Sequence, residues 1–341
     1  SVTAYYHFAF AGITVVMLGL TAGALKVYMS PEEFSAARAN LVLVDYTTRF
    51  CFNLVAAVLL HVYVAGLAVR WFPEATFTLY GSVIATPIAL ISLVSLCLLL
   101  CAFIQNGVCI ALLLTRFPEH SGRLYAADLA GAALGCIVVG AALMWLDPVA
   151  TLLLVTSAIL LAVRKLLPPD APSSLSRRWK KLTLVLVAFF VVQSCSYIAG
   201  EPAIRLLWTK AGVLNTAPFY ERWTSYARVS VSNTYDGMPF GWGFGGDHSK
   251  ERVKQAGLTI DAGAGTILTE FDGDVHKVAY LKDDIINLGY HFRKIDDAAV
   301  IGVGGGRDVL SGIVFGAKKI KGIEINPLIL DVLTNVYADF T

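Results

Sequence analysis

Charged residues are scarce in this chain. Asp, Glu, Lys and Arg make up only 15% of its 341 residues, while 56% are hydrophobic. Soluble domains carry about 25% charged residues, so the composition excludes a purely soluble protein. The scarcity is uneven, because residues 1–200 are mostly apolar and the acids and glycines gather after position 200. We therefore expect a transmembrane helical domain in residues 1–200, followed by a water-soluble part.

Cysteine is absent from the whole soluble part, which argues against a disulfide framework or a zinc site there. Cys97 and Cys101 share one face of an expected helix, where packing is the expected role, so we predict no metal site. The net charge of +2 predicts no general affinity for nucleic acid. The six cysteines, all in apolar segments, are Cys51, Cys97, Cys101, Cys109, Cys136 and Cys195.

Long apolar runs predict about six membrane spans, since one crossing needs about 20 apolar residues. The third run is long enough for one kinked helix, and two spans are the alternative. In the fourth run, Ala127, Gly131 and Gly135 repeat every four residues, which favours close helix packing. The lipid bilayer is the main expected partner. The runs cover 4–27, 51–69, 83–115, 124–146, 149–163 and 182–199.

A basic loop, 164–181, makes the sidedness of the soluble part ambiguous. Its cations predict that the loop is cytoplasmic, because cytoplasmic loops are enriched in Lys and Arg. One apolar run, 182–199, then separates the loop from the soluble part and would carry that part to the outside. A cytoplasmic cofactor would require the opposite side, which is the side we expect if the protein is catalytic. The loop's cations are Arg164, Lys165, Arg177, Arg178, Lys180 and Lys181.

We expect residues 201–297 to form a small β-rich region. Residues 226–232 alternate with the period of a strand, and residues 258–261 and 266–271 flank a Gly-rich turn, which predicts a hairpin. Residues 282–291 then favour a helix. The next segment, 298–341, starts with the apolar run Ala299–Ile301, typical of a buried parallel strand, and continues into a glycine-rich turn.

The glycine-rich turn, residues 302–306, is the strongest chemical signal in the chain. Glycines let the backbone turn sharply and approach a bound group closely. A helix over 307–316 and a strand over 320–323 follow, and Glu324 ends that strand, where an acid accepts hydrogen bonds from ribose hydroxyls. The G-x-G-x-x-G spacing fails, since Arg307 or Val309 stands where the third glycine belongs. This favours an S-adenosyl cofactor over NAD, while a turn kept only for packing is the alternative.

Three motifs resemble the spermidine synthase-like family in its membrane-fused branch. They are Gly302-Val-Gly-Gly-Gly-Arg-Asp-Val-Leu310, Gly322-Ile-Glu-Ile-Asn-Pro327 and Phe271-Asp-Gly273, and Leu124–Gly135 resembles the membrane half of such proteins. The resemblance implies a Rossmann-like S-adenosyl-binding fold, a bacterial cytoplasmic (inner) membrane location, and S-adenosylmethionine or its decarboxylated form as cofactor. The cofactor-binding residues that it implies are Gly302, Gly304, Gly305, Gly306, Asp308, Glu324 and Asn326.

The substrate end departs from the family's pattern. Asp272 matches an acid that borders the cofactor in the family, His291 falls at a matching place, and His276 stands where the family has Gln; we assign these three residues to substrate binding. Residues 285–287 lack the polar run of the family, and Gly306 replaces its Asp. The family's catalytic Asp lies beyond a fourth strand, so we expect the nucleotide-binding domain, 298–341, to be incomplete here, and we assign no catalytic residue.

Two functional hypotheses follow. The first is a membrane enzyme that transfers an aminopropyl or methyl group from an S-adenosyl donor to a small amine or a lipid-borne acceptor. The second is a non-catalytic membrane subunit that uses a degenerate synthase-like domain for assembly with membrane proteins or with a second copy of itself. A transporter-like module is a third, weaker hypothesis. Transport pathways usually contain ionisable residues inside the membrane, and the expected spans carry few of them, mainly His61 and Asp128.

Overall fold

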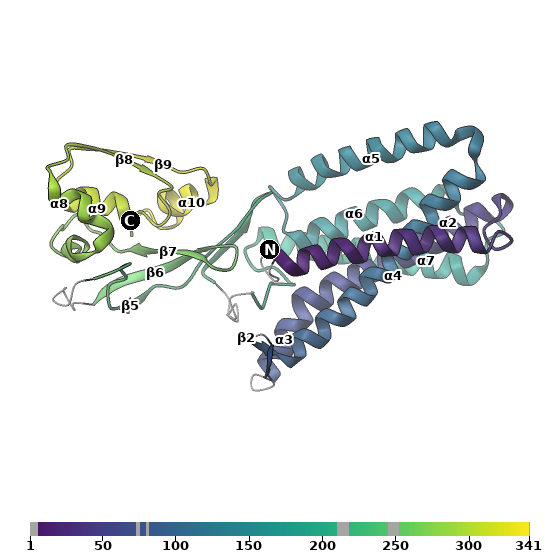
Figure 1. The fold of residues 1–341 in the computed structure, drawn as a ribbon, viewed down its shortest axis with the longest axis horizontal. Coiled ribbons are helices and arrows are strands. Elements are labelled where there is room, and N and C mark those ends of the chain that lie inside the picture. The colour runs from purple at the N-terminus through teal and green to yellow at the C-terminus, as the bar shows by residue number, and fades with distance from the viewer. Residues whose placement is uncertain (1–5, 73–75, 80–81, 210–217, 245–251, 341) are drawn as a thin grey trace. The chain divides into compact units, whose positions relative to one another are not determined.

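The computed structural model describes residues 6–72, 76–79, 82–209, 218–244 and 252–340, without the side chains of 6–9, 69, 76–79 and 82–87. The chain divides into two compact units, Ser1–Thr216 and Ala217–Thr341. We call them the membrane unit and the C-terminal unit and describe each by itself (Figure 1).

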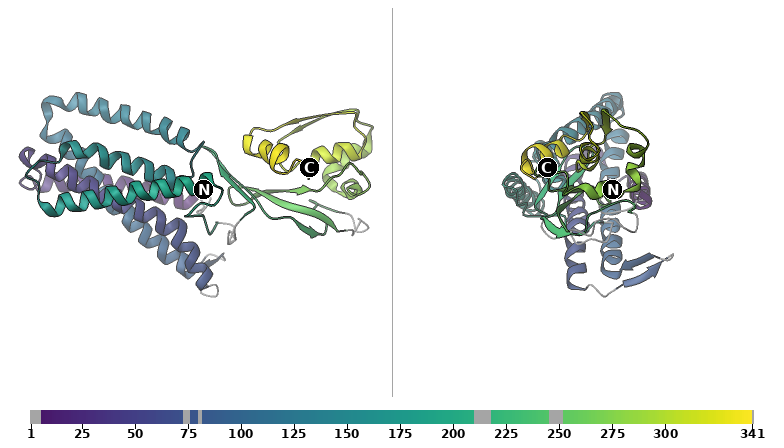
Figure 2. Two further views of the ribbon diagram at one scale, coloured as in Figure 1. Left: turned by 180° about the vertical axis from the view of Figure 1, so that it is seen from behind. Right: turned by 90° about the vertical axis from the view of Figure 1, so that its left-hand side faces the viewer.

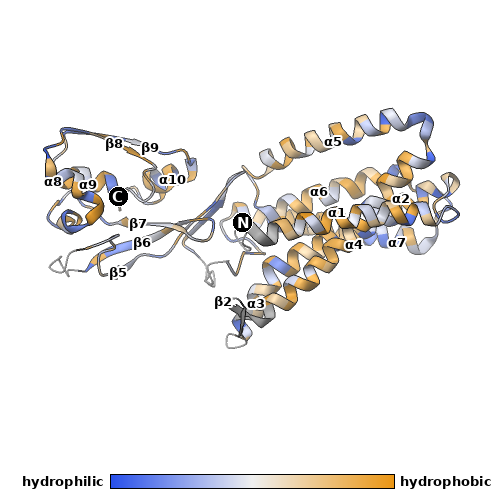
Figure 3. Cartoon of the chain, viewed as in Figure 1, coloured by the Kyte–Doolittle hydropathy of each residue, from blue (hydrophilic) through white to orange (hydrophobic). Residues whose placement is uncertain are grey.

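The membrane unit is helical, and within the described residues six of its helical stretches are long and apolar enough to cross a membrane. Most of their residues are hydrophobic, as the predominantly orange ribbons of these helices in Figure 3 show. A multi-pass membrane protein in contact with lipid is therefore supported. The helices are α1 (Tyr6–Met29), α2 (Ala39–Leu59), α3 (Ala65–Trp71), α4 (Thr86–Arg116), α5 (Ser121–Ala142), α6 (Pro148–Val163) and α7 (Ser173–Ile198), with β1 (Thr76–Leu79) and β2 (Ser82–Ala85) before α4.

Two expected spans begin earlier than the sequence predicted. The stretch expected at 51–69 starts at Ala39, because Asp45 and Arg49, one helical turn apart, pair at 2.6 Å and are tolerated inside the helix. A π-helical turn, Leu60–Val64, joins α2 to α3. The expected span 182–199 is the later part of α7, which begins at Ser173. The basic residues from Arg177 onward thus belong to a helix, not to a loop.

The third apolar run forms one continuous helix, α4, which excludes the two-span alternative. Its polar stretch does not break the helix, because Asn53 of α2 donates from Nδ2 to Gln105 Oε1 at 3.1 Å. Gly107 permits close contact with α1, since a Cβ at this position would stand 2.4 Å from the Leu20 carbonyl oxygen. A Cβ at Gly23 would likewise stand 2.2 Å from the Ile104 oxygen. Small residues therefore bring α1 and α4 together.

The small-residue stripe of α5 has no such neighbour among the described residues. No described atom comes within 4 Å of a Cβ built at Gly131 or Gly135, and none of the residues of α5 is buried. Among the residues that the structure describes, the close packing predicted for this stripe is therefore not formed. In the views of Figures 1 and 2, α5 runs alongside the other helices as a separate rod.

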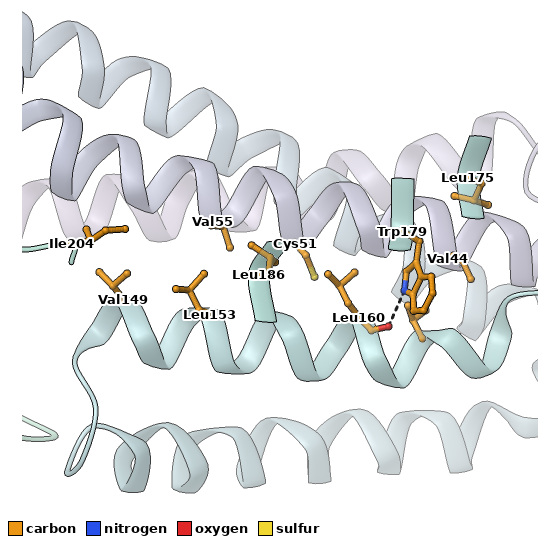
Figure 4. Close-up of a cluster of buried hydrophobic side chains, with 11 residues drawn as sticks. Val44, Cys51, Val55, Val149, Leu153, Leu160, Leu175, Trp179, Leu186 and Ile204 are labelled. Atoms are coloured by element: carbon orange, nitrogen blue, oxygen red, sulfur yellow. Dashed lines mark hydrogen bonds between the residues drawn. The ribbon is translucent and has the colours of Figure 1, made fainter. Parts of the chain in front are cut away.

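A buried apolar cluster joins α2, α6 and α7 (Figure 4). Leu153 and Leu160 of α6 are fully buried, and Trp179 of α7 donates from its indole nitrogen to the Leu160 carbonyl oxygen at 2.9 Å. A buried indole needs such a partner, and this bond fixes which face of α7 points inward.

A polar cluster ties the start of α6 to the end of α7. Asp147 caps α6 by accepting from the Ala150 amide at 2.7 Å, and its other oxygen accepts from Gln193 Nε2 at 2.6 Å. Gln193 also donates to the Ile204 carbonyl oxygen and accepts from the Ile204 amide. The side chains of Asp147 and Gln193 are nearly inaccessible to solvent, and they find their hydrogen-bond partners within the cluster.

The C-terminal unit starts with a small antiparallel sheet in the order β3-β4-β6-β5, with β7 paired to β6. The predicted hairpin is confirmed: β6 and β7 pair from Gln255 opposite Thr269 to Ile260 opposite Ala264. The helix expected over 282–291 is instead divided into short turns and α8 (Leu288–Phe292). The strands are β3 (Tyr220–Trp223), β4 (Arg228–Val231), β5 (Tyr235–Gly237), β6 (Val253–Ile260) and β7 (Ala264–Thr269).

A second, two-stranded sheet pairs β8 (Asp297–Ile301) with β9 (Lys319–Ile323) in parallel, and α9 (Arg307–Val314) connects them. The turn-helix-strand order predicted after residue 301 is confirmed. Beyond β9, α10 (Pro327–Asp331) and a π-helical turn place Ile329 and Val332 against Val229, Leu258 and Leu268 of the first sheet. This shared core packs the segment after β9 against the first sheet.

Candidate functional site

The glycine turn between β8 and α9 has a backbone that side chains tolerate poorly. Gly302, Gly304 and Gly306 all have positive φ angles, of 76°, 55° and 81°. Gly306 is also the N-cap of α9, and its amide donates to the Val303 carbonyl oxygen at 2.9 Å. A residue with a Cβ would be strained at each of these positions, which explains why the sequence has glycine there.

Glu324 closes the turn from the neighbouring strand end. Its Oε2 accepts from the Gly304 amide at 3.1 Å, and its Oε1 accepts from the Asn326 amide at 2.8 Å. Asn326 is buried and caps α10 by accepting from the Leu328 amide. A carboxylate oxygen has two lone pairs, so Glu324 is held in place at the turn and keeps acceptor capacity.

Gly305 serves packing inside the unit. It is buried, and a Cβ there would stand 2.4 Å from the Ile267 carbonyl oxygen of β7. By contrast, no described atom lies within 4 Å of a Cβ at Gly302, and that residue is exposed. The turn therefore has one face against the β6–β7 hairpin and an open side at Gly302.

Sequence reasoning gave no role to Arg307 and Asp284, which form a buried ion pair beside the turn. Arg307, the first residue of α9, is 5% exposed, and its Nη2 donates to Asp284 Oδ2 and to the Phe240 carbonyl oxygen. Asp284 is 2% exposed and also accepts from the amides of Trp242 and Gly243. Arg307 Nε and Nη1 have no partner among the described residues. Only the position of Arg307 directly after three glycines could have indicated its importance.

Burial and hydrogen bonding shift the pKa of Asp284 in opposite directions. Burial alone would raise the pKa of this carboxyl, but the Trp242 amide and the Arg307 guanidinium outweigh it and hold the pKa below its usual value. The ionised form is therefore the stable one in the folded unit, and the pair is charged at neutral pH.

The remaining predicted residues are dispersed. Asp308 is exposed in the first turn of α9. Asp272 is exposed and pairs with Lys277 at 2.5 Å, and hydrogen bonding to that lysine lowers the pKa of Asp272. The amide of His276, also exposed, donates to Asp274.

His291 lies near the opposite end of α9 from the glycine turn. Its Nε2 is 2.9 Å from the Lys282 carbonyl oxygen, and its ring meets that of Phe315, which directly follows α9. The structure thus brings Glu324, Asn326 and the glycines together, while His291 stands about one helix length, roughly 12 Å, away.

No group of three His, Cys, Asp or Glu side chains among the described residues is arranged to hold a metal ion. In comparisons with known proteins, no family model, curated protein or solved structure matches the chain.

Proposed function

We propose that the protein is a multi-pass membrane transferase that binds an S-adenosyl nucleotide at the glycine turn of its C-terminal unit. The observation that carries the proposal is Glu324, a carboxylate at the end of a parallel strand that is already fixed to the Gly304 amide. Carboxylates at this place in α/β folds accept hydrogen bonds from ribose hydroxyls.

The residues present fit the adenosine end of such a cofactor. Gly302 provides open backbone beside Glu324, and the first turn of α9 provides amides with positive partial charge. When bound, the cofactor supplies an electrophilic carbon, either a methyl or an aminopropyl group. The protein's contribution is then to hold donor and acceptor in line, where positioning lowers the barrier. A small amine or a lipid-borne amine is the proposed acceptor.

Calorimetry on the purified full chain tests the proposal, with S-adenosylmethionine, its decarboxylated form and 5′-methylthioadenosine as ligands. Glu324→Ala should weaken binding by about 1.5–3 kcal/mol, the value of hydrogen bonds to a charged group. Glu324→Gln, which keeps the shape of the side chain, should show part of this loss. Asp296→Ala, an exposed acid whose partner is Lys318, is the matched control and should bind like the wild type. Absence of binding at millimolar ligand would exclude the proposal.

Assembly is the second candidate, and the exposed apolar residues of the parallel sheet favour it. Ile301 is 83% exposed and Ile325 is 88% exposed, although both lie in or next to the strands that flank the turn. Gly305 packs closely against β7 inside the unit, so at this position the glycine has a structural reason that needs no ligand. If no S-adenosyl ligand binds and Ile301→Ser releases a co-purifying protein or converts an oligomer to a monomer, the C-terminal unit serves assembly.

A further inference from the structure

A cleft on α7 lies far along the chain from the glycine turn and is independent of the proposed function. It is shallow and widely open, with a volume of about 550 Å³. All of its lining residues lie on one face of the helix, because their spacing alternates between three residues and one. They are Ser173, Ser176, Arg177, Lys180, Lys181 and Leu184.

Three cationic side chains in this cleft have no carboxylate partner among the described residues. Arg177, Lys180 and Lys181 are exposed and form no ion pair with any described residue, whereas their neighbour Arg178 pairs with Asp45 at 3.2 Å. Three like charges within two helical turns repel one another, and an anion placed among them would relieve that repulsion.

The helix start adds donors to the same place. The N-cap of α7 is Pro172, which provides no side-chain oxygen for the first amides of the helix. Ser173 and Ser176, which carry hydroxyl groups, are among the residues that line the cleft. A helix N-terminus without a side-chain cap and with nearby hydroxyl groups favours bound anions, so the donors and the three cations act in the same direction.

The opposite face of α7 is fixed. Leu175, Trp179 and Leu186 are buried in the cluster of Figure 4, and the Trp179 indole is bonded to the Leu160 carbonyl oxygen. The cations therefore cannot rotate into the protein, and the cleft faces the surroundings of the membrane unit.

An apolar track continues from the cleft along the same helix face. Leu184 is 71% exposed, Ala188 is exposed, and Val191 is 51% exposed, at spacings of four and three residues. This part of α7 belongs to a candidate membrane span. A ligand that fills the cleft and follows the track must combine a negatively charged head with a hydrocarbon chain.

We propose that this cleft binds an anionic phospholipid. The phosphate lies among Arg177, Lys180 and Lys181, the hydroxyls of Ser173 and Ser176 donate to its oxygens, and one acyl chain runs along Leu184, Ala188 and Val191. Basic residues at the end of a membrane helix attract anionic headgroups, and each contributes a favourable interaction near the bilayer surface.

Native mass spectrometry of the full chain in detergent tests the proposal, with phosphatidylglycerol and phosphatidylcholine of equal chain length as probes. The wild type should retain phosphatidylglycerol in preference to phosphatidylcholine. Replacing Arg177, Lys180 and Lys181 together by Gln should lower the affinity for phosphatidylglycerol at least about tenfold. The matched control replaces three exposed lysines of the C-terminal unit, Lys318, Lys319 and Lys321, by Gln and should leave the affinity unchanged.

The proposal would be overturned by equal affinities of the wild type for the two lipids, by an equal loss in the control variant, or by unchanged binding in the cleft variant. The single variants Lys180→Gln and Arg177→Gln, which disturb the helix less, keep the test valid if the triple variant does not fold. Each should weaken phosphatidylglycerol binding several-fold. Glycerol 3-phosphate separates the two sources of phosphate: if it competes as well as the lipid does, the cleft is a site for free phosphates and not for a lipid.

Discussion

Asp147 in the membrane unit and Asp284 in the C-terminal unit are two buried carboxylates with different surroundings. Asp147 accepts from a backbone amide and from Gln193, whose own donors and acceptor are all used. Asp284 also accepts from amides, but its main partner is the Arg307 guanidinium, two nitrogens of which have no partner among the described residues. The first cluster is held by neutral donors, while the second contains a buried cation that depends on one acid.

The difference indicates separate roles. A carboxylate bonded only to neutral donors fastens helix ends without bringing a buried cation into the protein, which suits a position at the end of membrane helices. A buried ion pair is a costly way to stabilise a fold, because desolvation offsets much of its attraction. We infer that Arg307 and Asp284 are kept because they fix the start of α9, and with it the glycine turn. Four predictions test this contrast.

The largest effect is expected from Asp284→Ala, because it leaves Arg307 buried without its carboxylate. Removing one partner of such a pair costs about 3–5 kcal/mol. Hydrogen exchange of the full chain in detergent should show loss of amide protection in α9 and β6, with the helices of the membrane unit unchanged. Asp283→Ala removes an exposed neighbouring acid and should leave protection as in the wild type. Equal protection in both variants would contradict the assigned role of the pair.

Gln193→Leu is expected to have the next largest effect. It deprives the Ile204 amide and carbonyl oxygen of their Gln193 partner, and each buried group left unsatisfied costs about 1–3 kcal/mol. The start of α6 and the end of α7 should lose protection, while the C-terminal unit stays unchanged. Val192→Leu, at an adjacent position that is 52% exposed, is the control. If both variants behave alike, the cluster does not hold the two helix ends together.

A third variant, Gly305→Ala, tests whether the glycine turn is held against β7. The new methyl group would stand 2.4 Å from the Ile267 carbonyl oxygen, and overpacking of this kind costs about 1–3 kcal/mol. Protection should fall in β7 and in the turn. Gly289→Ala, where no described atom is within 4 Å, should have little effect. Wild-type protection in Gly305→Ala would show that the contact is not close in solution.

The apolar runs predicted the six membrane stretches well, because a bilayer demands long uninterrupted hydrophobicity. The starts of α2 and α7 were placed too late in the sequence. Charged residues such as Arg49 and Arg177 lie in the first part of these helices, and a helix can contain charged residues near its end. The hairpin and the turn-helix-strand order followed from glycine positions and strand periodicity.

The parts that sequence reasoning missed depend on contacts between distant residues. Asp284 and Arg307 are 23 residues apart, and nothing in the local pattern separates Asp284 from the exposed Asp283. The role of Gly305 became visible only with Ile267 against it. Likewise, the glycines that pack α1 on α4, Gly23 and Gly107, lie on different helices and form no stripe in the sequence. The predicted cofactor and substrate residues stay predictions until a ligand is tested.

The smallest effect is expected from acid, and it tests whether Asp284 is the ionised partner of Arg307. The pKa of Asp284 is lowered in the folded protein, so the stability that it contributes is present above the unfolded-state pKa of about 3.9 and is lost as the pH falls through the folded value. Protection of α9 should therefore decrease below about pH 4 in the wild type. In Asp284→Asn the pair is already absent, so the same acidification should reduce protection less steeply. Other acids, such as Asp272, titrate in both proteins and cancel in the comparison. The experiment compares protection at pH 7 and pH 3 after correction for the intrinsic exchange rate. Parallel losses in the two proteins would show that Asp284 is not the ionised partner of Arg307.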